Sequence, residues 1–507
     1  MESTVRVRFA PSPTGGLHIG GVRTILFNYL FAKQNNGKFI LRIEDTDQTR
    51  FVKGAEDYIY SCLNWCGIKA DESTRAGGDY GPYRQSERKS IYRQYAEQLV
   101  KSGYAYYAFD TSDELECKRQ VTENFRYDQN TRQTLRNSLN IPHEAAGNLI
   151  REGAPHVIRI KIPKDEQIHF TDMIRGDVSF SSNDVDDKVL LKADGMPTYH
   201  LAVVVDDYLM KITHAFRGEE WLPSAPIHIL LWKYLCLESE MPQWAHLPLI
   251  LKPNGNGKLS KRDGEKFGFP VYPINWVDPA SGKKSDGFLD VGFLPEGFIN
   301  MLAMLGWNDG TEQEIFSMGD LIEKFSMQRI HKGGAKFDYE KAKWFNQEWI
   351  KRSSAKHLLN PVKAVLNNAD IHEFSDEQLS GVIELVKERC VLLPDFVEQA
   401  SFFFKAPDKY DTSAVKPKWD SKKHSFFIAF ADNLSKNDFS DSANLEMKFK
   451  DLATEQGLKT GDVMLPLRIM LVGGKFGPQV FDIANKIGKE ETINRINKAL
   501  KAFEKYK

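Results

Sequence analysis

Near its beginning the chain reads Val5-Arg6-Val7-Arg8-Phe9-Ala10-Pro11-Ser12-Pro13-Thr14-Gly15-Gly16-Leu17-His18-Ile19-Gly20-Gly21. Apolar and basic side chains alternate over residues 5–9, which predicts a short strand, and the prolines and glycines after them predict a turn. Apolar residues recur at helical spacing from about Gly20 to Lys33, and Asn35-Asn36-Gly37 would end that helix. The next segment, Phe39-Ile40-Leu41-Arg42-Ile43, predicts a second strand.

A strand, a helix and a second strand in about 40 residues form a crossover unit. Such a unit favours a parallel sheet with helices on its faces. Sheets of this kind bind ligands at the carboxyl ends of their strands. Residues 9–20 and 44–47 would both lie there, so we expect them to contribute to a functional site.

The composition is that of a folded, multi-domain protein. At about 100–200 residues per domain, 507 residues predict three or four domains, and 41% hydrophobic residues supply each with a core. The formal charge is −1 and the usage of Gly and Pro is ordinary, which excludes a disordered or collagen-like chain. A nucleic-acid partner would therefore need a local basic face.

The start of the chain lacks the profile of a secretion signal, and no apolar stretch approaches the length of a membrane span. The five cysteines are scattered and odd in number, which favours reduced thiols. We therefore expect a cytoplasmic protein. Cys62 and Cys66 lie one helical turn apart and are more typical of buried core thiols than of metal ligands.

Further along, the pattern divides the chain into regions. Residues 110–190 hold short, charged elements with strand candidates at 156–162 and 178–180, which indicates an inserted domain. Residues 198–205 have the texture of a strand, and residues 227–234 that of a buried helix. From about residue 320 to the end, almost everything is typical of amphipathic helices.

Two motifs are suited to phosphate. The first, His18 with Gly20 and Gly21, lies where the first strand meets its helix, and backbone N–H groups and the helix dipole favour an anion there. The second, Lys258-Leu259-Ser260-Lys261-Arg262, follows the glycine-rich residues 254–257 and could close on a triphosphate. Taken singly, each motif also fits an ordinary turn.

Taken together, the motifs resemble those of class I aminoacyl-tRNA synthetases, in particular bacterial glutamyl-tRNA synthetases. The resemblance rests on residues 8–15, 18–21, 42–47 (RIEDTD) and 258–262. It continues in the same order over about 300 residues, through GPYRQSER (81–88), PHVIR (155–159), DGMPTYHL (194–201), VVDD (204–207), RGEEW (217–221) and FLPEG (293–297). Beyond residue 350 the chain resembles the family only in length and helical texture.

The resemblance implies a multi-domain α/β protein. A Rossmann-like, parallel-sheet catalytic domain would occupy residues 1–109 and 191–255, split by an α+β insertion at 110–190 that binds the acceptor end of tRNA. The KLSKR loop and a region contacting the tRNA stem would follow at 256–335, and an all-α anticodon-binding region at 336–507. The implied enzyme is a monomeric glutamate–tRNA ligase that uses ATP and Mg²⁺, glutamate and tRNA-Glu.

The resemblance also implies the site residues. His18, Lys258 and Lys261 would be catalytic, because activation requires positive donors on the ATP phosphates. The remaining residues would bind the substrates: Gly20, Gly21 and Ser260 together with the catalytic three for ATP, and Arg8, Ala10, Ser12, Glu44, Tyr199 and Arg217 for glutamate. A guanidinium suits a carboxylate; we expect Arg8 on the side-chain carboxylate and Glu44 on the ammonium. Alternatively, Glu44 and Asp47 form an acid cluster that stabilises the fold, which we favour for Asp47.

The chain departs from the family pattern at three places. Gly21 replaces the second histidine of the His-Ile-Gly-His motif, so backbone contacts would substitute for it. Tyr107 is followed by Ala108, Phe109 and Asp110 where some relatives carry a Cys-x-Cys zinc motif, so no zinc is expected. Residues 263–291 form a stretch longer than the family pattern predicts, and the sequence assigns it no role.

Several alternatives stay open. A glutaminyl-tRNA synthetase would require a β-barrel tail, but residues 320–507 lack regularly spaced short strands. A non-catalytic tRNA-binding relative is disfavoured because both phosphate motifs are intact. A dinucleotide-dependent oxidoreductase lacks its Gly-x-Gly-x-x-Gly motif after the first strand. Whether tRNA-Gln is also charged is not decided by the sequence.

Residues 330–363 are a candidate tRNA surface. They hold eight Lys or Arg against three acids, a net charge of +5, with Trp344, Phe345 and Trp349 interleaved. Basic charge beside aromatic rings suits a polyanion with exposed bases. The alternative interpretation is a solvated helix face whose aromatic side chains pack inward.

Overall fold

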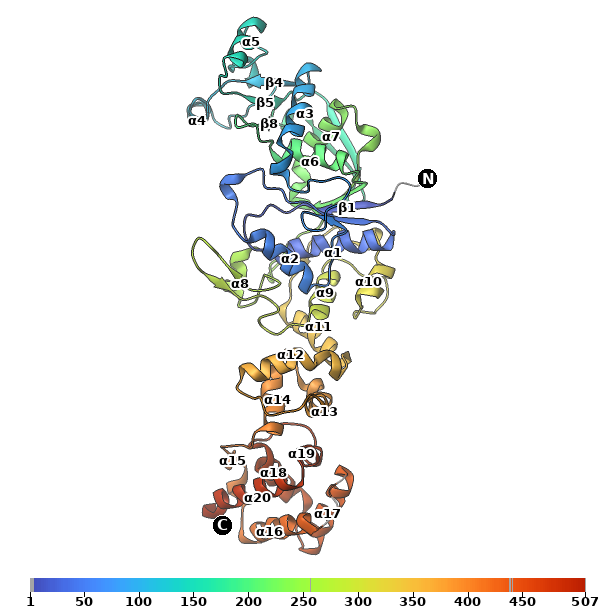
Figure 1. Cartoon of the computed structure of the whole chain (residues 1–507), viewed down its shortest axis with the longest axis vertical. Coiled ribbons are helices and arrows are strands. Elements are labelled where there is room, and N and C mark those ends of the chain that lie inside the picture. The colour runs from blue at the N-terminus through green and yellow to red at the C-terminus, as the bar shows by residue number, and fades with distance from the viewer. Residues whose placement is uncertain (1–3, 256, 437–438, 440, 507) are drawn as a thin grey trace. The chain divides into compact units, whose positions relative to one another are not determined.

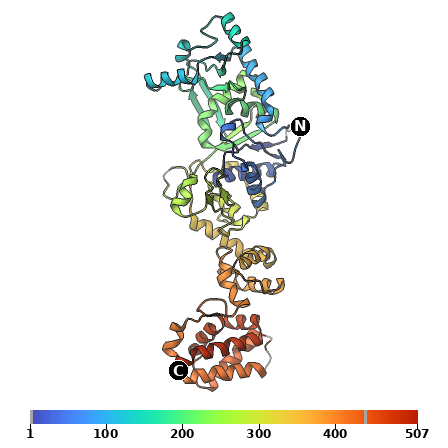
Figure 2. The same cartoon turned by 60° about the vertical axis from the view of Figure 1, so that its left-hand side comes forward.

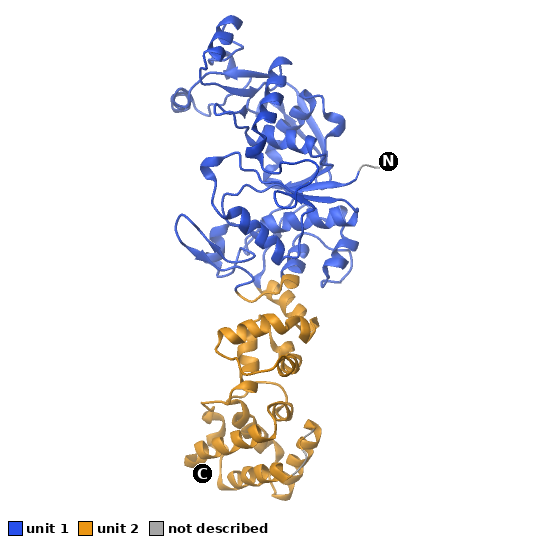
Figure 3. Ribbon diagram, in the orientation of Figure 1, with its two compact units in different colours: residues 1–290, 298–339 blue, residues 291–297, 340–507 orange. Residues whose placement is uncertain are grey.

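A computed structural model describes residues 4–255, 257–436, 439 and 441–506 of the chain. The chain forms two compact units, shown in different colours in Figure 3. Unit 1 comprises residues 1–290 and 298–339, and unit 2 comprises residues 291–297 and 340–507.

Unit 1 is built around a seven-stranded sheet with the order β3-β2-β1-β9-β10-β6-β7. All neighbouring strands are parallel except β6 and β7, which are antiparallel. The pairing of β1 with β2 sets Arg8 opposite Ile40 and Phe9 opposite Leu41. The strands are β1 (Arg6–Phe9), β2 (Lys38–Leu41), β3 (Glu72–Ser73), β6 (Gln167–Asp172), β7 (Gly176–Ser181), β9 (His214–Gly218) and β10 (Gln243–Leu247).

Helices cover both faces of this sheet. Figure 1 shows α1 and α2 on one face and α3, α6 and α7 on the other. The expected strand, helix and strand near the start of the chain are therefore confirmed. The helices up to residue 338 are α1 (Ile19–Gln34), α2 (Ala55–Trp65), α3 (Lys89–Lys101), α4 (Ser112–Val121), α5 (His143–Arg151), α6 (Tyr199–Leu209), α7 (Ala225–Tyr234), α8 (Lys261–Phe267), α9 (Pro295–Met304) and α10 (Met318–Lys324).

Three small sheets complete the strands of the described residues. They are formed by β4 (Ala105–Ala108), β5 (Val157–Ile160) and β8 (Val189–Leu191); by β11 (Ile250–Leu251) and β14 (Ala335–Lys336); and by β12 (Trp276–Val277) and β13 (Lys284–Ser285). The expected insertion at 110–190 does not coincide with one sheet. Its own sheet begins with β4, before residue 110, whereas β6 and β7 hydrogen-bond to the central sheet through β10.

The strand-like stretch 198–205 is a helix, so that part of the sequence interpretation was wrong. It forms α6, in which residues 201–207 are all buried. A helix buried on all sides has a continuous apolar run, which its periodicity does not distinguish from a buried strand. The helix expected at 227–234 is confirmed as α7.

The arginines of β1 are buried. Arg6 donates two hydrogen bonds to the carboxylate of Glu72, at 2.7 and 2.8 Å, and Arg8 is likewise paired inside the protein. The alternation of apolar and basic residues in β1 therefore does not indicate a strand with one buried and one solvent-exposed face. A parallel sheet covered on both sides buries every side chain, and buried charges require partners.

Unit 2 is helical. Every regular element described from residue 339 to residue 506 is a helix, as Figure 2 also shows, and this confirms the all-α region. The helices are α11 (Tyr339–Arg352), α12 (Ala355–Asn368), α13 (Asp376–Val386), α14 (Asp395–Phe404), α15 (Thr412–Val415), α16 (Ser421–Lys436), α17 (Ser442–Glu455), α18 (Thr460–Val472), α19 (Val480–Ile487) and α20 (Lys489–Phe503). Their apolar faces share a core rich in Phe and Leu.

Two smaller expectations concern side-chain burial. Phe345 is buried and Trp349 packs against the core of unit 2, so these rings are directed inward. Cys62 and Cys66 are both buried, as expected for core thiols, and burial raises the pKa of Cys62 to about 12. None of the described helices is long and apolar enough to cross a membrane.

Candidate active site

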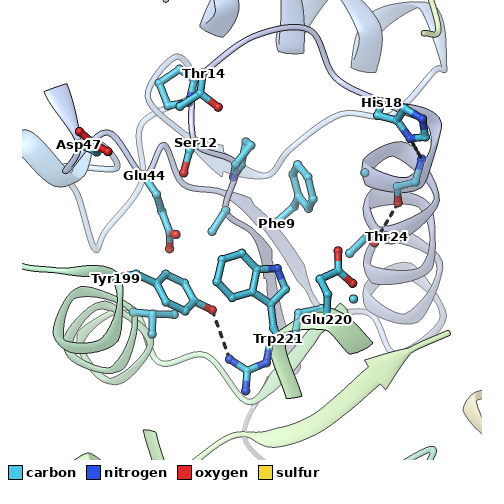
Figure 4. Close-up of a pocket in the computed structure, with 18 of the residues that line it drawn as sticks. Phe9, Ser12, Thr14, His18, Thr24, Glu44, Asp47, Tyr199, Glu220 and Trp221 are labelled. Carbon is cyan, nitrogen blue, oxygen red and sulfur yellow. Dashed lines mark hydrogen bonds between the residues drawn. The ribbon is translucent and has the colours of Figure 1, made fainter. Parts of the chain in front are cut away.

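A cavity of about 980 Å³ lies at the carboxyl ends of β1 and β9. Its walls come from the turn after β1, the start of α1, the segments after β2 and β9, the start of α6 and the KLSKR loop. Figure 4 shows His18 at the start of a helix on one side of the cavity and Glu44 and Tyr199 on the other. All the expected site residues line this cavity: Arg8, Ala10, Ser12, His18, Gly20, Gly21, Glu44, Tyr199, Arg217, Lys258, Ser260 and Lys261.

Arg8 lines the cavity but already has an acidic partner. Its guanidinium donates to both carboxylate oxygens of Asp207, at 3.1 and 2.9 Å, and both side chains are about 5% exposed. A further N–H lies 3.5 Å from the carbonyl oxygen of Phe216. The acidic partner of Arg8 is therefore Asp207, and neither Glu44 nor Asp47. Asp47 instead accepts a hydrogen bond from the hydroxyl of Thr49 at 2.6 Å.

Glu44 is joined to Arg8 through two intermediates. Asp207 also accepts from Arg42 at 2.8 Å, and Arg42 donates to Glu44 at 3.1 Å. Arg42 is fully buried. Burial raises the pKa of Glu44 to about 6, although Arg42 and Arg8 oppose the shift. The Glu44 carboxylate is thus held at the cavity wall by a chain of alternating charges.

Arg217 has a different environment. It is 8% exposed, and its guanidinium donates to His246 Nε2 at 2.9 Å, to His228 Nδ1 at 3.0 Å and to the Tyr199 hydroxyl at 3.3 Å. These partners are neutral or weakly polar, and its buried Nη2 has no hydrogen-bond partner in the part of the chain that the structure describes. Burying a guanidinium without an acidic partner costs free energy, and a bound anion would offset that cost.

The histidines around Arg217 have defined tautomers, because a guanidinium can only donate. His246 accepts at Nε2, so its Nδ1–H donates to Asp172 at 2.6 Å. His228 accepts at Nδ1, so its Nε2–H donates to His200 at 3.2 Å. Burial lowers the pKa of all three histidines, that of His200 to about 4. The three histidines therefore stay uncharged, and they do not neutralise the positive charge of Arg217.

His18 caps α1. Its Nδ1 accepts from the Gly20 amide at 3.1 Å, so the proton of the neutral ring is on Nε2, which is buried without a partner among the described residues. Burial, with help from Lys261 and Lys258, lowers the pKa of His18 to about 4. At the position of the missing second histidine, a Cβ at Gly21 would lie 2.8 Å from Leu17 Cδ1, so a side chain there would require the Leu17 side chain to shift.

The KLSKR residues are held in different ways. Lys258 Nζ lies 2.5 Å from Glu220 Oε1 in an exposed ion pair. The amide and hydroxyl of Ser260 both donate to Asp263, at 2.8 and 2.6 Å, and so cap α8. Lys261 lies close to the turn after β1, 3.3 Å from the place that a Cβ would take at Gly15. Of the glycine-rich approach to this loop, Asn256 lies outside the described residues.

The sequence interpretation missed the partners of the expected residues. Asp206 and Asp207 follow the apolar residues of α6, and two acids inside a buried run require buried cations, which was a usable signal. They pair with Arg88 and with Arg8 and Arg42. No comparable signal indicated His228, His246 and Asp172, since the three come from separate elements. Trp221, whose ring lies 4.5 Å from that of Tyr199, was quoted but given no role.

Within the described residues, no group of three or more His, Cys, Asp or Glu side chains is arranged to hold a metal ion. Residues 108–110, which replace the zinc motif of some relatives, make other contacts. Asp110 accepts from the amide of Arg136 and from the hydroxyl of Tyr127, both at 3.0 Å. The absence of zinc stays a prediction.

Comparison with known proteins covers the whole chain. A family model described as the catalytic domain of class I tRNA synthetases (E and Q) matches residues 4–344, and one described as an anticodon binding domain matches residues 342–500. The glutamate–tRNA ligase of Christiangramia forsetii is 52% identical over 504 residues, and that of Bacteroides fragilis is 50% identical over 504 residues. Each alignment covers 99% of both proteins.

A solved structure has the same fold over its full length. A glutamate tRNA ligase from Elizabethkingia meningosepticum, in complex with its amino acid, matches with a TM-score of 0.94 and 50% identity and covers 100% of each chain. A glutamate-tRNA synthetase from Elizabethkingia anophelis matches with a TM-score of 0.91 and 50% identity, covering 98% of this chain and 100% of the other.

Proposed function

The chain belongs to the class I tRNA synthetases for glutamate and glutamine, and within them to the glutamate–tRNA ligases, and from this membership we propose how its own residues carry out the reaction. The α-carboxylate oxygen of L-glutamate attacks the α-phosphorus of ATP, and the bond from that phosphorus to the bridging oxygen of pyrophosphate breaks. The glutamyl group then passes from the adenylate to the 3′-terminal adenosine of tRNA-Glu.

The observation that carries the glutamate assignment is the unpartnered Nη2 of Arg217. A glutamate carboxylate would complete its hydrogen bonds and neutralise a buried charge. We assign the side-chain carboxylate to Arg217, because this group stays ionised through the reaction, whereas the α-carboxylate becomes an anhydride. This replaces the expectation that Arg8 takes the side-chain carboxylate, since the carboxylate of Asp207 already accepts two hydrogen bonds from Arg8.

Glu44 would bind the α-ammonium, and Arg8 would act as a positioning residue. The chain of contacts from Arg8 through Asp207 and Arg42 fixes the carboxylate of Glu44 at the cavity wall. Tyr199 would contribute its hydroxyl beside Arg217, at 3.3 Å from the guanidinium. Ala10 and Ser12 line the same space and would shape the pocket around the substrate.

ATP would lie toward the start of α1. His18 and the first turn of α1 line this side of the cavity, and the dipole at the start of the helix favours an anion there. Lys258 and Lys261 would stabilise the charge that develops on the leaving pyrophosphate. Ser260 would act through its cap on α8 as well as through its place in the wall of the cavity. Magnesium bound to the phosphates would add positive charge.

The helical region would bind the anticodon part of tRNA-Glu, and the protein would work as a monomer without zinc. Deleting residues 336–507 should weaken tRNA binding and make its salt dependence shallower, because phosphate contacts are lost. An unaltered salt slope would count against this role. One zinc per chain by elemental analysis would refute the expected absence of that metal.

The decisive experiment is pyrophosphate exchange with each of the twenty amino acids, with and without tRNA. We expect exchange with glutamate alone, and charging of tRNA-Glu. Exchange with glutamine at a comparable rate would refute the assignment of the pocket, and the absence of exchange with any amino acid would favour the non-catalytic alternative. A charging assay with tRNA-Gln under the same conditions would settle the breadth of tRNA use.

A further inference from the structure

The stretch that the sequence left without a role, residues 263–291, contains a segment packed against both phosphate motifs. We define the support segment as residues 269–290. It is closed on itself by β12 and β13 and by hydrogen bonds from Phe288 to Tyr272 at 2.9 Å and from Leu289 to Pro273 at 3.0 Å. The segment is thus an ordered element of unit 1.

The support segment contacts the first phosphate motif directly. The amide of Ile19, the first residue of α1, donates to the carbonyl oxygen of Val271 at 3.0 Å. A Cβ at Gly16 would lie 2.8 Å from Trp276 Cγ and 2.8 Å from Tyr272 Cε1. Since the φ of Gly16 is not in the left-handed region, space rather than backbone conformation requires glycine there.

The same two aromatic rings are tied to the rest of the fold. Tyr58 in α2 stacks edge-on against Trp276, with ring centroids 4.8 Å apart, and its hydroxyl donates to the carbonyl oxygen of Ile274 at 2.6 Å. Tyr272 is buried, and Trp276 is half-buried. Tyr58 therefore holds the Trp276 ring and the backbone between the two rings, and both rings lie against Gly16.

The second phosphate motif meets the same support. Lys261 Nζ lies 5.9 Å from the centre of the Tyr272 ring, a distance within cation–π range. Lys283 in the support segment pairs with Glu265 of α8 at 2.5 Å. Tyr272, Trp276 and the Gly15-Gly16 turn do not line the cavity. They would therefore act on ATP through His18, which follows that turn, and through Lys261, both of which line it.

We propose that the support segment is a positioning element for ATP, in which Tyr272 and Trp276 hold the Gly15-Gly16 turn and Lys261 at the separation that the triphosphate requires. The proposal rests on the function proposed above and adds a role for a stretch outside the catalytic residues. Misplacing a phosphate-binding group by about 1 Å can reduce a rate by about 100-fold, so such support has a measurable effect.

The test uses pyrophosphate exchange by the full-length chain. Trp276→Ala should raise the KM for ATP by about tenfold and leave the KM for glutamate within about twofold, because the charged residues proposed for glutamate, Glu44 and Arg217, lie outside the turn that Trp276 contacts. Trp276→Phe should restore most of the ATP affinity. The matched control is Val277→Ala, on the same strand but 47% exposed, which should behave as the unmodified chain.

A double-mutant cycle makes the test independent of stability. Gly16→Ala should raise the KM for ATP in the unmodified chain but by a smaller factor in the Trp276→Ala background, where only Tyr272 of the two rings still crowds the methyl group. Additive effects would overturn the proposal, as would equal increases in the KM values for ATP and glutamate. Lys261→Ala separates the two levels: if it has no effect, the proposed role of Lys261 on the phosphates fails, whereas if it lowers exchange while Trp276→Ala does nothing, only the support role fails.

Discussion

Two buried arginines at the ends of neighbouring strands, Arg8 in β1 and Arg217 in β9, differ in what surrounds them. Arg8 meets the carboxylate of Asp207 through two hydrogen bonds. Arg217 meets the uncharged rings of His228 and His246, and one of its nitrogens has no partner among the described residues. The same residue type is neutralised in one place and left charged in the other.

The comparison separates an arginine that stabilises the fold from one that is available to bind an anionic substrate. A paired charge has already recovered part of its desolvation cost, so a ligand gains little by approaching it. A cation held by neutral acceptors keeps its field and its spare donor for an incoming anion. Proximity to the cavity alone would have ranked the two arginines equally, because both line it.

The largest effect should come from Arg8→Gln, and it should be on stability. The variant leaves Asp207 buried with Arg42 as its remaining cation, and breaking a buried pair costs about 3–5 kcal/mol. We expect the melting temperature of unit 1 to fall by about 5 °C or more. A variant with an unchanged melting curve and a lost preference for glutamate over glutamine would reverse the comparison.

Arg217→Gln should affect catalysis instead. Leaving a substrate carboxylate without its charged partner costs about 2–5 kcal/mol, so kcat/KM for glutamate should fall by about 30-fold or more. Trace activity with glutamine should fall less, and the melting temperature should stay within about 2 °C. Steady-state kinetics with both amino acids and a melting curve measure this, with Arg8→Gln as the matched control. Loss of stability without a change in the glutamate-to-glutamine ratio would contradict the receptor role.

Lys261→Ala tests a second cation of the cavity wall, on which Asp278 acts electrostatically. Because it would engage fully only as charge moves onto pyrophosphate, its removal should slow adenylate formation by at least about tenfold, or about 1.4 kcal/mol. The KM for glutamate should change less. Single-turnover formation of the adenylate is the measurement, and an unchanged rate would remove Lys261 from the catalytic residues.

Glu44 tests the charged chain that begins at Arg8. Its pKa of about 6 means that the ionised form, which the substrate ammonium requires, is lost as the pH falls through 6. The KM for glutamate should therefore rise by about tenfold between pH 7 and pH 5. Glu44→Gln should bind glutamate weakly with no such pH dependence. A flat profile for the unmodified chain would show that Glu44 does not bind the ammonium.

The smallest effect should come from Glu220→Gln, which breaks a charge pair that is exposed rather than buried. The side chains of Lys258 and Glu220 are 53% and 39% exposed, and exposed pairs contribute about 0.2–1 kcal/mol. Releasing Lys258 for ATP should lower the KM for ATP by about two- to fivefold at most. Pyrophosphate exchange at low and high salt measures this, and the difference should shrink as salt increases. A raised KM would instead make Glu220 a direct contributor to ATP binding.

Much of the secondary structure and both phosphate motifs could be predicted from local sequence. The strand, turn and helix at residues 5–34 follow from alternation, proline, glycine and helical spacing, which act between near neighbours in the chain. The same is true of the helices after residue 339 and of the phosphate motifs at His18 and at Lys258 to Arg262. Each of these patterns involves side chains only a few positions apart, so a single sequence is enough to recognise it.

Contacts between residues far apart in the chain could not be predicted from local sequence. Arg8 and Asp207 are 199 positions apart, and Asp172 and His246 are 74 apart. The stretch 198–205 looked like a strand because burial on all sides removes the periodicity of a helix. In the sequence, Arg8 and Arg217 are the same type of residue, and nothing near them shows which one is paired inside the fold. Their difference arises only when packing brings an acid to one and neutral histidines to the other.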